Sequence, residues 1–238
     1  YINKGESGRA QIEREKKNIE SLISDISHQT KTPLANILLY TQLLSESSRL
    51  GDEDKMIAGQ IESQTEKLSF LISSLVKTSR LETGIIAVNP SEQDTEGLLR
   101  QLTDDYMPAA EQKNITLVLG ENAAGSAVFD YKWTIEAIAN IVDNAIKYTP
   151  CGGTITLNAS EYSMFARIDI SDTGIGMTEA ETAAVFQRFY RSPGVSDEKG
   201  VGIGLYLARE ILEREDGYIK VSSEKGKGST FSVFLHKK

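Results

Sequence analysis

The chain has 238 residues, 39% of them hydrophobic and 25% charged, and this length can bury one ordinary domain plus a smaller one in a folded globular protein. Its net charge of −8 argues against nucleic acid as a partner, because phosphate binding requires a basic surface. The only cysteine, Cys151, excludes an intramolecular disulfide, and no Cys/His cluster has the spacing of metal ligands.

The apolar runs fall short of the roughly 20 residues that a membrane span requires, and no signal-peptide pattern opens the chain. Residue 1 is Tyr rather than Met, so we expect a piece of a longer protein and leave open an upstream membrane-spanning sensor segment. We expect this piece to be cytoplasmic, since its cysteine usage fits a reducing compartment.

Residues 10–48 follow a helical pattern that only Pro33 interrupts. Apolar positions recur at heptad spacing, which predicts a packing seam. The two rows of this seam are Ile19, Ile26, Pro33, Tyr40 and Ile23, Thr30, Ile37, Leu44.

A second helix is predicted after the glycine and the acidic turn of "SRLGDED" (residues 48–54). The row of positions expected to pack on this helix is spaced alternately by four and three residues, with occasional polar members. It consists of Ile57, Ile61, Gln64, Leu68, Leu71, Leu75 and Glu82. Two helices with one narrow apolar stripe each bury it poorly alone, so we predict a dimer whose two hairpins form a four-helix bundle.

The segment 82–94 breaks the heptads with Gly84 and Pro90, which is typical of a hinge. Beyond it, helical and strand periods alternate. Helices are predicted at 95–113, at 132–147 and near Thr178 and Leu205, and strands at 115–119, 127–130, 154–160, 164–171, 218–223 and 229–235. This mixture predicts a sheet covered by helices on one face, an α/β two-layer sandwich.

His28 lies about 200° around the first helix from Ile26, so it is expected to face water, with Gln29 beside it and Thr32 one turn on. A lone exposed histidine is often a surface residue without a role. Pro33 within a long helix costs on the order of 3 kcal/mol unless context relieves it, and it is either a tolerated bend or a placed kink. The hairpin alone does not decide between these interpretations.

Three further stretches carry signals for a bound phosphate. Asn140, Asn144 and Lys147 share one face of the helix 132–147, although asparagine is a poor helix former. "DTGIGM" (172–177) ends a strand in an acid and a glycine turn, and "GVGIGL" (200–205) precedes a helix whose free N–H groups can receive phosphate. Each signal is weak by itself, because the glycines could mark turns and the asparagines a polar helix face.

The Walker A loop and the H-R-D and D-F-G signatures of protein kinases are absent from the sequence. Together, the motifs resemble the sensor histidine kinases of two-component systems over nearly the whole chain. "SHQTKTPL" (27–34) resembles the H box, "NIVDNAIKYTP" (140–150) the N box, "DTGIGM" the G1 box, "FQRFYR" (186–191) the F box and "GVGIGL" the G2 box. "GKGSTF" (226–231) is similar to the strand-entry glycines that close the domain.

The resemblance implies an α+β chain. Its dimerisation and histidine-phosphotransfer hairpin would occupy residues 1–82, a hinge 83–93, and a Bergerat-type ATP-binding domain 94–238. The implied ligands are ATP and Mg²⁺, and the implied partners are a second copy of the chain and the receiver domain of a response regulator.

The resemblance also implies roles for single residues. Asn144 would be the Mg²⁺ ligand and Asn140 would support the phosphates, while Asp172 would accept a hydrogen bond from the adenine amino group. The other implied nucleotide-binding residues are Lys147, Tyr148, Gly174, Gly176, Arg188, Arg191, Gly200, Gly202, Gly204 and Leu205. Residues 192–199 would form a lid, and surface charge without a role stays the alternative for the two arginines.

The implied reaction is attack of an imidazole nitrogen of His28 on the γ-phosphate of ATP, followed by transfer to a regulator aspartate. The family usually has Glu or Asp after the histidine, whereas this chain has Gln29. A neutral amide supports imidazolium less well, so we expect slower autophosphorylation. A further hypothesis is that Gln29 and Thr32 orient water for dephosphorylating the regulator.

Two rival interpretations stay open. One is a degenerate kinase that acts as a nucleotide-binding scaffold or a regulator phosphatase, which only Gln29 supports. The other is a different Bergerat ATPase, such as a chaperone or topoisomerase module, which would have no need for an outward histidine on a heptad hairpin.

Overall fold

The structure, a computed structural model, describes residues 26, 29–46, 51–84, 87–120, 125–192 and 201–237. His28 and Gly200, both expected in the site, lie outside the described residues, as do residues 193–199 of the expected lid. The chain divides mainly between Ala87 and Val88 into two compact units.

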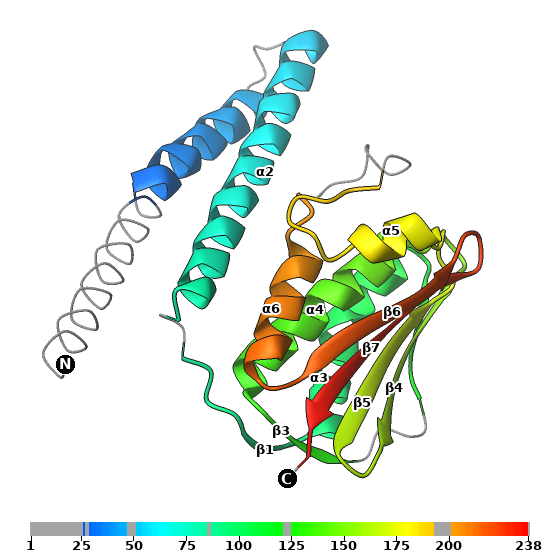
Figure 1. The fold of residues 1–238 in the computed structure, drawn as a ribbon. Coiled ribbons are helices and arrows are strands. Elements are labelled where there is room, and N and C mark those ends of the chain that lie inside the picture. Colours follow the sequence, from blue (N-terminus) through cyan, green and yellow to red (C-terminus); the bar gives the residue numbers. More distant parts are fainter. Residues whose placement is uncertain are drawn as a thin grey trace, which may run out of the picture. The chain divides into compact units, whose positions relative to one another are not determined.

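The first unit contains a helix over residues 29–45 and the long helix α2 (Asp52–Glu82), which are antiparallel (Figure 1). Its buried side chains are Leu34, Thr41, Ala58, Thr65, Ser74, Thr78 and Leu81. The predicted seam is therefore displaced within one chain: Leu34 and Thr41 are 6% and 4% exposed, whereas Ile37 and Leu44 of the predicted rows are 40% and 47% exposed. The contact inside the hairpin combines Leu34 and Leu81 with small or polar residues, whereas Ile37 and Leu44 of the predicted rows are exposed.

The second unit alternates strands and helices much as the sequence periods predict. In chain order its elements are β1 (Ser91–Asp94), α3 (Thr95–Gln112), β2 (Thr116–Leu119), β3 (Ser126–Phe129), α4 (Tyr131–Tyr148), β4 (Thr154–Glu161), β5 (Phe165–Asp172), α5 (Glu179–Ala184), α6 (Gly204–Arg214), β6 (Tyr218–Glu224) and β7 (Gly228–His236).

The main sheet has five strands in the order β2-β4-β5-β7-β6, with only the β2–β4 pair parallel. Helices α3, α4 and α6 cover one face of this sheet (Figure 1). Strand residues alternate in burial because successive side chains point to opposite faces, as in β4, where Ile155, Leu157 and Ala159 are buried and the residues between them are partly exposed. The expected two-layer α/β sandwich is confirmed.

The core between the layers is aliphatic. Helix positions three and four residues apart on α3, α4 and α6 meet the covered face of the sheet. The fully buried side chains of this core include Leu98, Leu99, Leu102, Ile138, Ile141, Ile155, Leu157, Ile168, Ile170 and Ile211. This packing fixes the directions of α4 and α6, which carry six of the thirteen residues expected to bind nucleotide.

The second half of the predicted hinge differs from expectation. Ser91–Asp94 form strand β1, which pairs antiparallel with β3 so that Ser91 lies opposite Phe129. The sequence "SEQD" has low strand propensity, so the pairing comes from tertiary structure rather than local preference. Asp94 at its end also caps α3, because its carboxylate accepts from the N–H groups of Glu96 and Gly97.

Within the described ranges, no helix combines the length and the hydrophobicity that crossing a membrane would require.

Candidate functional site

The two asparagines expected at the site lie on α4, both half-buried. Asn140 Nδ2 donates to the carbonyl of Glu136 at 2.8 Å, which orients its side-chain oxygen. That oxygen lies beside Gly204, where a Cβ would stand 2.7 Å from Asn140 Oδ1. The N box and the start of α6 are therefore in direct contact, and Gly204 is the first residue of α6 rather than part of the preceding loop.

The glycine turn after β5 packs on the carboxyl end of α4. Ile175 N–H donates to the carbonyl of Tyr148 at 3.2 Å, and a Cβ on Gly174 would stand 2.6 Å from the same oxygen. Lys147 Nζ lies 4.8 Å from the ring centroid of Tyr148. Helix α4 thus contacts the G1 turn at its carboxyl end and the G2 segment at Asn140.

Asp172 ends β5 with a half-buried carboxylate. Its Oδ1 accepts from the N–H groups of Gly174 at 2.8 Å and Ser229 at 3.3 Å. Burial raises the pKa of Asp172, and these two hydrogen bonds oppose that rise. Within the described part of the chain both bonds end on Oδ1, which leaves Oδ2 to accept from a ligand.

Gly176 packs closely against the backbone of the β6–β7 hairpin. Its φ of +61° is left-handed, and the space that a Cβ would need is filled by the carbonyl of Glu224. Gly202, with φ +76°, lies in the same way against the carbonyl of Tyr190. Both glycines are required by the fold's own backbone packing.

The first turn of α6 differs from those of α3, α4 and α5 in having no side-chain cap. The other helices of this unit have side-chain caps, from Asp94 on α3, Asp130 on α4 and Thr178 on α5. The N-cap residue of α6 is Ile203, which supplies no capping hydrogen bond. The first N–H groups of α6, which include that of Leu205, are consequently the ones that a phosphate can satisfy.

Residues 186–192, called here the arm, carry the two expected arginines. Arg188 Nη2 donates to the Tyr206 hydroxyl at 2.8 Å and its guanidinium lies 4.6 Å from that ring. Tyr206 is in the first turn of α6, so Arg188 is held at the end of α6 where Asn140 lies. Arg191 is half-buried.

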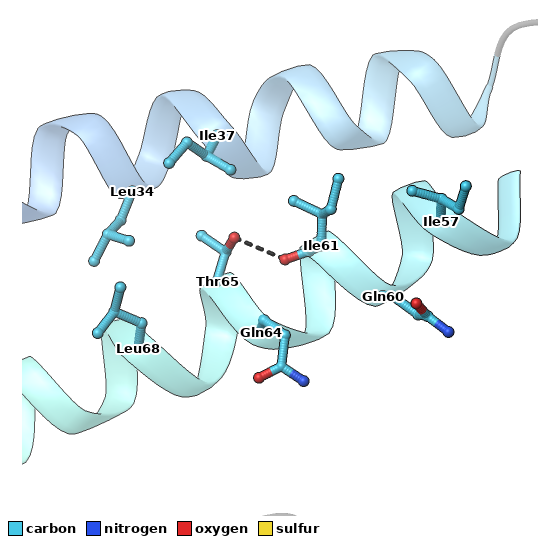
Figure 2. A pocket seen from close by; sticks show the side chains of 8 residues that line it. All are labelled: Leu34, Ile37, Ile57, Gln60, Ile61, Gln64, Thr65 and Leu68. Atoms are coloured by element: carbon cyan, nitrogen blue, oxygen red, sulfur yellow. Dashed lines mark hydrogen bonds between the residues drawn. The ribbon is translucent and has the colours of Figure 1, made fainter. Parts of the chain in front are cut away.

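The hairpin unit presents Gln29 and Thr32 as exposed residues of its first helix. A groove of about 610 Å³ also lies in this unit. Figure 2 shows the residues that line it: Leu34, Ile37, Ile57, Gln60, Ile61, Gln64, Thr65 and Leu68. Most of its apolar residues belong to the predicted heptad rows, and none of its lining comes from the residues expected to hold nucleotide.

Some residues that shape the site were not predicted. Lys113 Nζ donates to the last-turn carbonyls of Ile146 at 2.9 Å and Lys147 at 2.6 Å, which fixes the end of α4. Glu181 contacts Ser192 of the arm. The pattern T-x-x-E at 178–181 is a capping-box signature and could have drawn attention to Glu181, whereas nothing in the sequence pairs Lys113 with α4.

Two family descriptions match the two units of the chain. "His Kinase A (phospho-acceptor) domain" matches residues 18–84, and "Histidine kinase-, DNA gyrase B-, and HSP90-like ATPase" matches residues 129–238. The chain belongs to the sensor histidine kinase family. The family predicted from the motif order is thereby confirmed.

Sequence relatives of this sensor kinase include two bacterial proteins at slightly more than 30% identity. Adaptive-response sensory kinase SasA from Synechococcus elongatus is 32% identical over 93% of this chain and 60% of its own length. Histidine protein kinase SaeS from Staphylococcus aureus is 31% identical over 95% of this chain and 66% of its own length. The chain thus spans a little under two thirds of these relatives.

Solved structures of sensor kinases share the fold. Full-length ShkA in complex with AMPPNP matches with a TM-score of 0.75 and 24% identity, over 92% of this chain and 46% of ShkA. Histidine kinase AdeS from Acinetobacter baumannii matches with a TM-score of 0.65 and 19% identity, over 89% of this chain and 98% of AdeS.

Proposed function

We propose that this chain is the kinase portion of a sensor that phosphorylates its own His28 from ATP and passes the phosphoryl group to an aspartate of a response regulator. In the first step an imidazole nitrogen of His28 forms a bond to the γ-phosphorus as the bond to the ADP oxygen breaks. Such a transfer depends on positioning and charge stabilisation more than on covalent chemistry from the protein.

The observation that carries this proposal is the convergence of three distant segments in the second unit. Helix α4 contacts the uncapped start of α6 through Asn140 and the glycine turn after Asp172 through Tyr148. An acceptor oxygen, the N–H groups of a helix start without a side-chain cap, and cations therefore come from segments that meet on one helix. Adenine and phosphate need this combination of groups.

In this proposal Asp172 Oδ2 accepts from the adenine amino group, and the first N–H groups of α6 bind phosphate. Lys147, Arg188 and Arg191 supply the positive charge that an acidic chain needs for an anion. The AMPPNP complex of ShkA, which has the same fold, supports a nucleoside triphosphate as the ligand.

The residues present also fit Mg²⁺. Asn144 is half-buried on the same face of α4 as Asn140, and an amide oxygen is a hard ligand of the kind that Mg²⁺ accepts. Among the described residues there is no cluster of His, Cys, Asp and Glu that could hold a metal ion alone. This suits an ion that arrives with the nucleotide and takes most of its ligands from phosphate and water.

We further propose that the hairpins of two copies pack into a four-helix bundle. Ile57, Ile61 and Leu68 are 48%, 43% and 45% exposed within one chain, and they line the groove (Figure 2). Exposed leucine and isoleucine at heptad spacing are the expected seam of a helical bundle with a second copy.

The regulator's receiver domain would meet the part of the first helix that carries Gln29 and Thr32, which are both exposed. Gln29, in place of the usual acid, is the specific observation that favours the second candidate: a weak kinase that acts mainly as a regulator phosphatase. We also propose a cytoplasmic location in a membrane-anchored sensor, and the boundaries 1–82, 83–93 and 94–238 stay predictions.

The proposal is tested by incubating the whole chain with Mg²⁺ and γ-labelled ATP. We expect acid-labile, base-stable label on the wild type and no label on His28→Gln. Asn144→Ala should also lose the label, whereas Asn158→Ala, the same change on the other face of the sheet, should keep it. Label that survives His28→Gln would overturn the proposal, as would a wild type that binds no nucleotide.

The roles proposed for Gln29 and Thr32 are tested with separate variants. Gln29→Glu should increase the rate of His28 labelling if the neutral amide limits the reaction. Thr32→Ala should slow dephosphorylation of a phosphorylated receiver domain. An unchanged rate in either assay would contradict the corresponding role.

A further inference from the structure

The arm is anchored along its length by other elements of the ATP-binding unit. Near its start, Phe186 packs edge-to-face on Phe231 of β7 with ring centroids 6.2 Å apart. In its middle, Arg188 is bonded to Tyr206 of α6. At its end, the Ser192 hydroxyl donates to Glu181 Oε1 of α5.

The backbone of the arm needs such anchors. Phe189 has a φ of 60°, a left-handed conformation that costs a bulky residue on the order of 1–3 kcal/mol, and its side chain is 53% exposed. Its own side chain therefore provides little burial to hold this conformation. Fixed contacts on both sides of Phe189 keep the strained turn in place.

Glu181 is built to hold the end of the arm. Its side chain is 12% exposed, and Oε2 accepts from both the N–H and the hydroxyl of Thr178 at 2.8 Å. Lys225, in the turn between β6 and β7, lies 3.8 Å from the same oxygen. The Ser192 hydroxyl, followed by the two Thr178 donors, lowers the pKa of Glu181 to about 2, so the carboxylate is charged at neutral pH.

The two carboxylate oxygens of Glu181 accept hydrogen bonds from different segments. Oε2 completes the capping box of α5 with Thr178, and this needs nothing from Ser192. Oε1 is the oxygen that reaches the arm. The Ser192 bond is therefore an addition to helix capping that ties α5 to the segment carrying the arginines.

We propose that Glu181 and Ser192 form a latch that positions Arg188 and Arg191 for the phosphates of a bound nucleoside triphosphate. This inference rests on the nucleotide site proposed above. The two residues are positioning residues, since they act through the arm and make no contact with the ligand themselves. Without the latch the end of the arm is free to relax the Phe189 turn. Arg191 then loses its fixed place, and Arg188 keeps its bond to Tyr206 on a backbone that is no longer held at its end.

The test measures dissociation constants of the whole chain for adenosine and for Mg-ATP by calorimetry. Ser192→Ala removes the donor, and Ser192→Thr keeps a hydroxyl. Ser222→Ala, the same change at an exposed position of β6, is the matched control. Unfolding followed by the fluorescence of Trp133 identifies any variant that is simply less stable.

We expect Ser192→Ala to weaken Mg-ATP on the order of tenfold, because a hydrogen bond to a charged group is lost. Adenosine, which lacks phosphates, should bind Ser192→Ala like the wild type, and Ser192→Thr should recover most of the Mg-ATP affinity. A general loss of structure would instead weaken adenosine and Mg-ATP together. In a double-mutant cycle, Glu181→Gln should add little to Ser192→Ala.

Equal Mg-ATP affinity of Ser192→Ala and wild type would overturn the latch while leaving the nucleotide site intact. Equal losses for adenosine and Mg-ATP, or full additivity in the cycle, would also overturn it. A wild type that binds neither ligand would remove the proposed function, and the latch with it.

Discussion

Glu215 is a buried carboxyl whose ionisation should oppose folding. It follows the last residue of α6, is 3% exposed, and accepts from the Thr134 hydroxyl at 2.7 Å and from the Asp130 N–H at 3.1 Å. Burial raises the pKa of Glu215 to about 7, against an ordinary value of 4.5, although the two hydrogen bonds oppose the rise. The folded state therefore binds the proton more tightly than the unfolded chain does.

The sign and size of the effect follow from linkage. Because the folded pKa is the higher one, the stabilisation from this group is fully present below pH 4.5 and is lost as the pH rises through 7. With these two pKa values, the free energy of unfolding should fall by about 2.5 kcal/mol between pH 5 and pH 8.5 on account of Glu215 alone. Glu215→Gln, which stays neutral and keeps an acceptor for the Asp130 N–H, should lack this fall.

The assay is denaturant unfolding at several pH values, followed by the single tryptophan. Trp133 lies in the first turn of α4, one residue from Thr134, and reports on this unit. Glu111→Gln, the same change on an exposed residue of α3, should leave the pH dependence of the wild type unaltered. Parallel pH curves for wild type and Glu215→Gln would refute the reasoning.

Three other perturbations test separate parts of the structure. Gly176→Ala should destabilise the ATP-binding unit by about 2 kcal/mol or more, because it places a Cβ against a carbonyl at positive φ; a thermal midpoint equal to the wild type's would contradict this. Lys113→Met keeps the apolar stem but removes two bonds to the end of α4, so we expect a loss of about 1–2 kcal/mol in urea unfolding, with Lys132→Met as the exposed control. Leu68→Glu should weaken the proposed dimer about tenfold or more in sedimentation, while a dimer of unchanged affinity would exclude the groove as its interface.

The local sequence pattern was sufficient to predict the helix α4 and the strands β4 and β5. The period of residues 132–147 predicted α4 within a residue at each end, because its buried positions recur at helical spacing. Alternation predicted β4 and β5 in the same way. Asn140 and Asn144 stand out in the sequence because two poor helix formers in such a helix need a reason other than propensity.

The local sequence pattern did not predict which strands pair or which side chains pack inside the hairpin. The sequence "SEQD" has no strand preference, yet β1 forms because β3 offers it a partner. In the hairpin, the rows predicted from heptad spacing include Ile37 but not Leu34, and only the packed pair of helices decides that Leu34 is buried while Ile37 stays exposed. Periodicity shows which face of a helix or strand is apolar, but it does not show which other element packs against that face.

The sequence by itself determined the family and the order of helices and strands apart from β1, since these depend on motifs and on short-range periods. The residues of the proposed nucleotide site were also chosen from these motifs. Only the tertiary structure decided which polar atoms pair. Asp172 bonds Ser229, Thr134 bonds Glu215, and Ser192 bonds Glu181. These partners lie 57, 81 and 11 residues apart, so no local rule joins them. Each pair exists because packing of the sheet and its helices buries a carboxylate that must then find a donor.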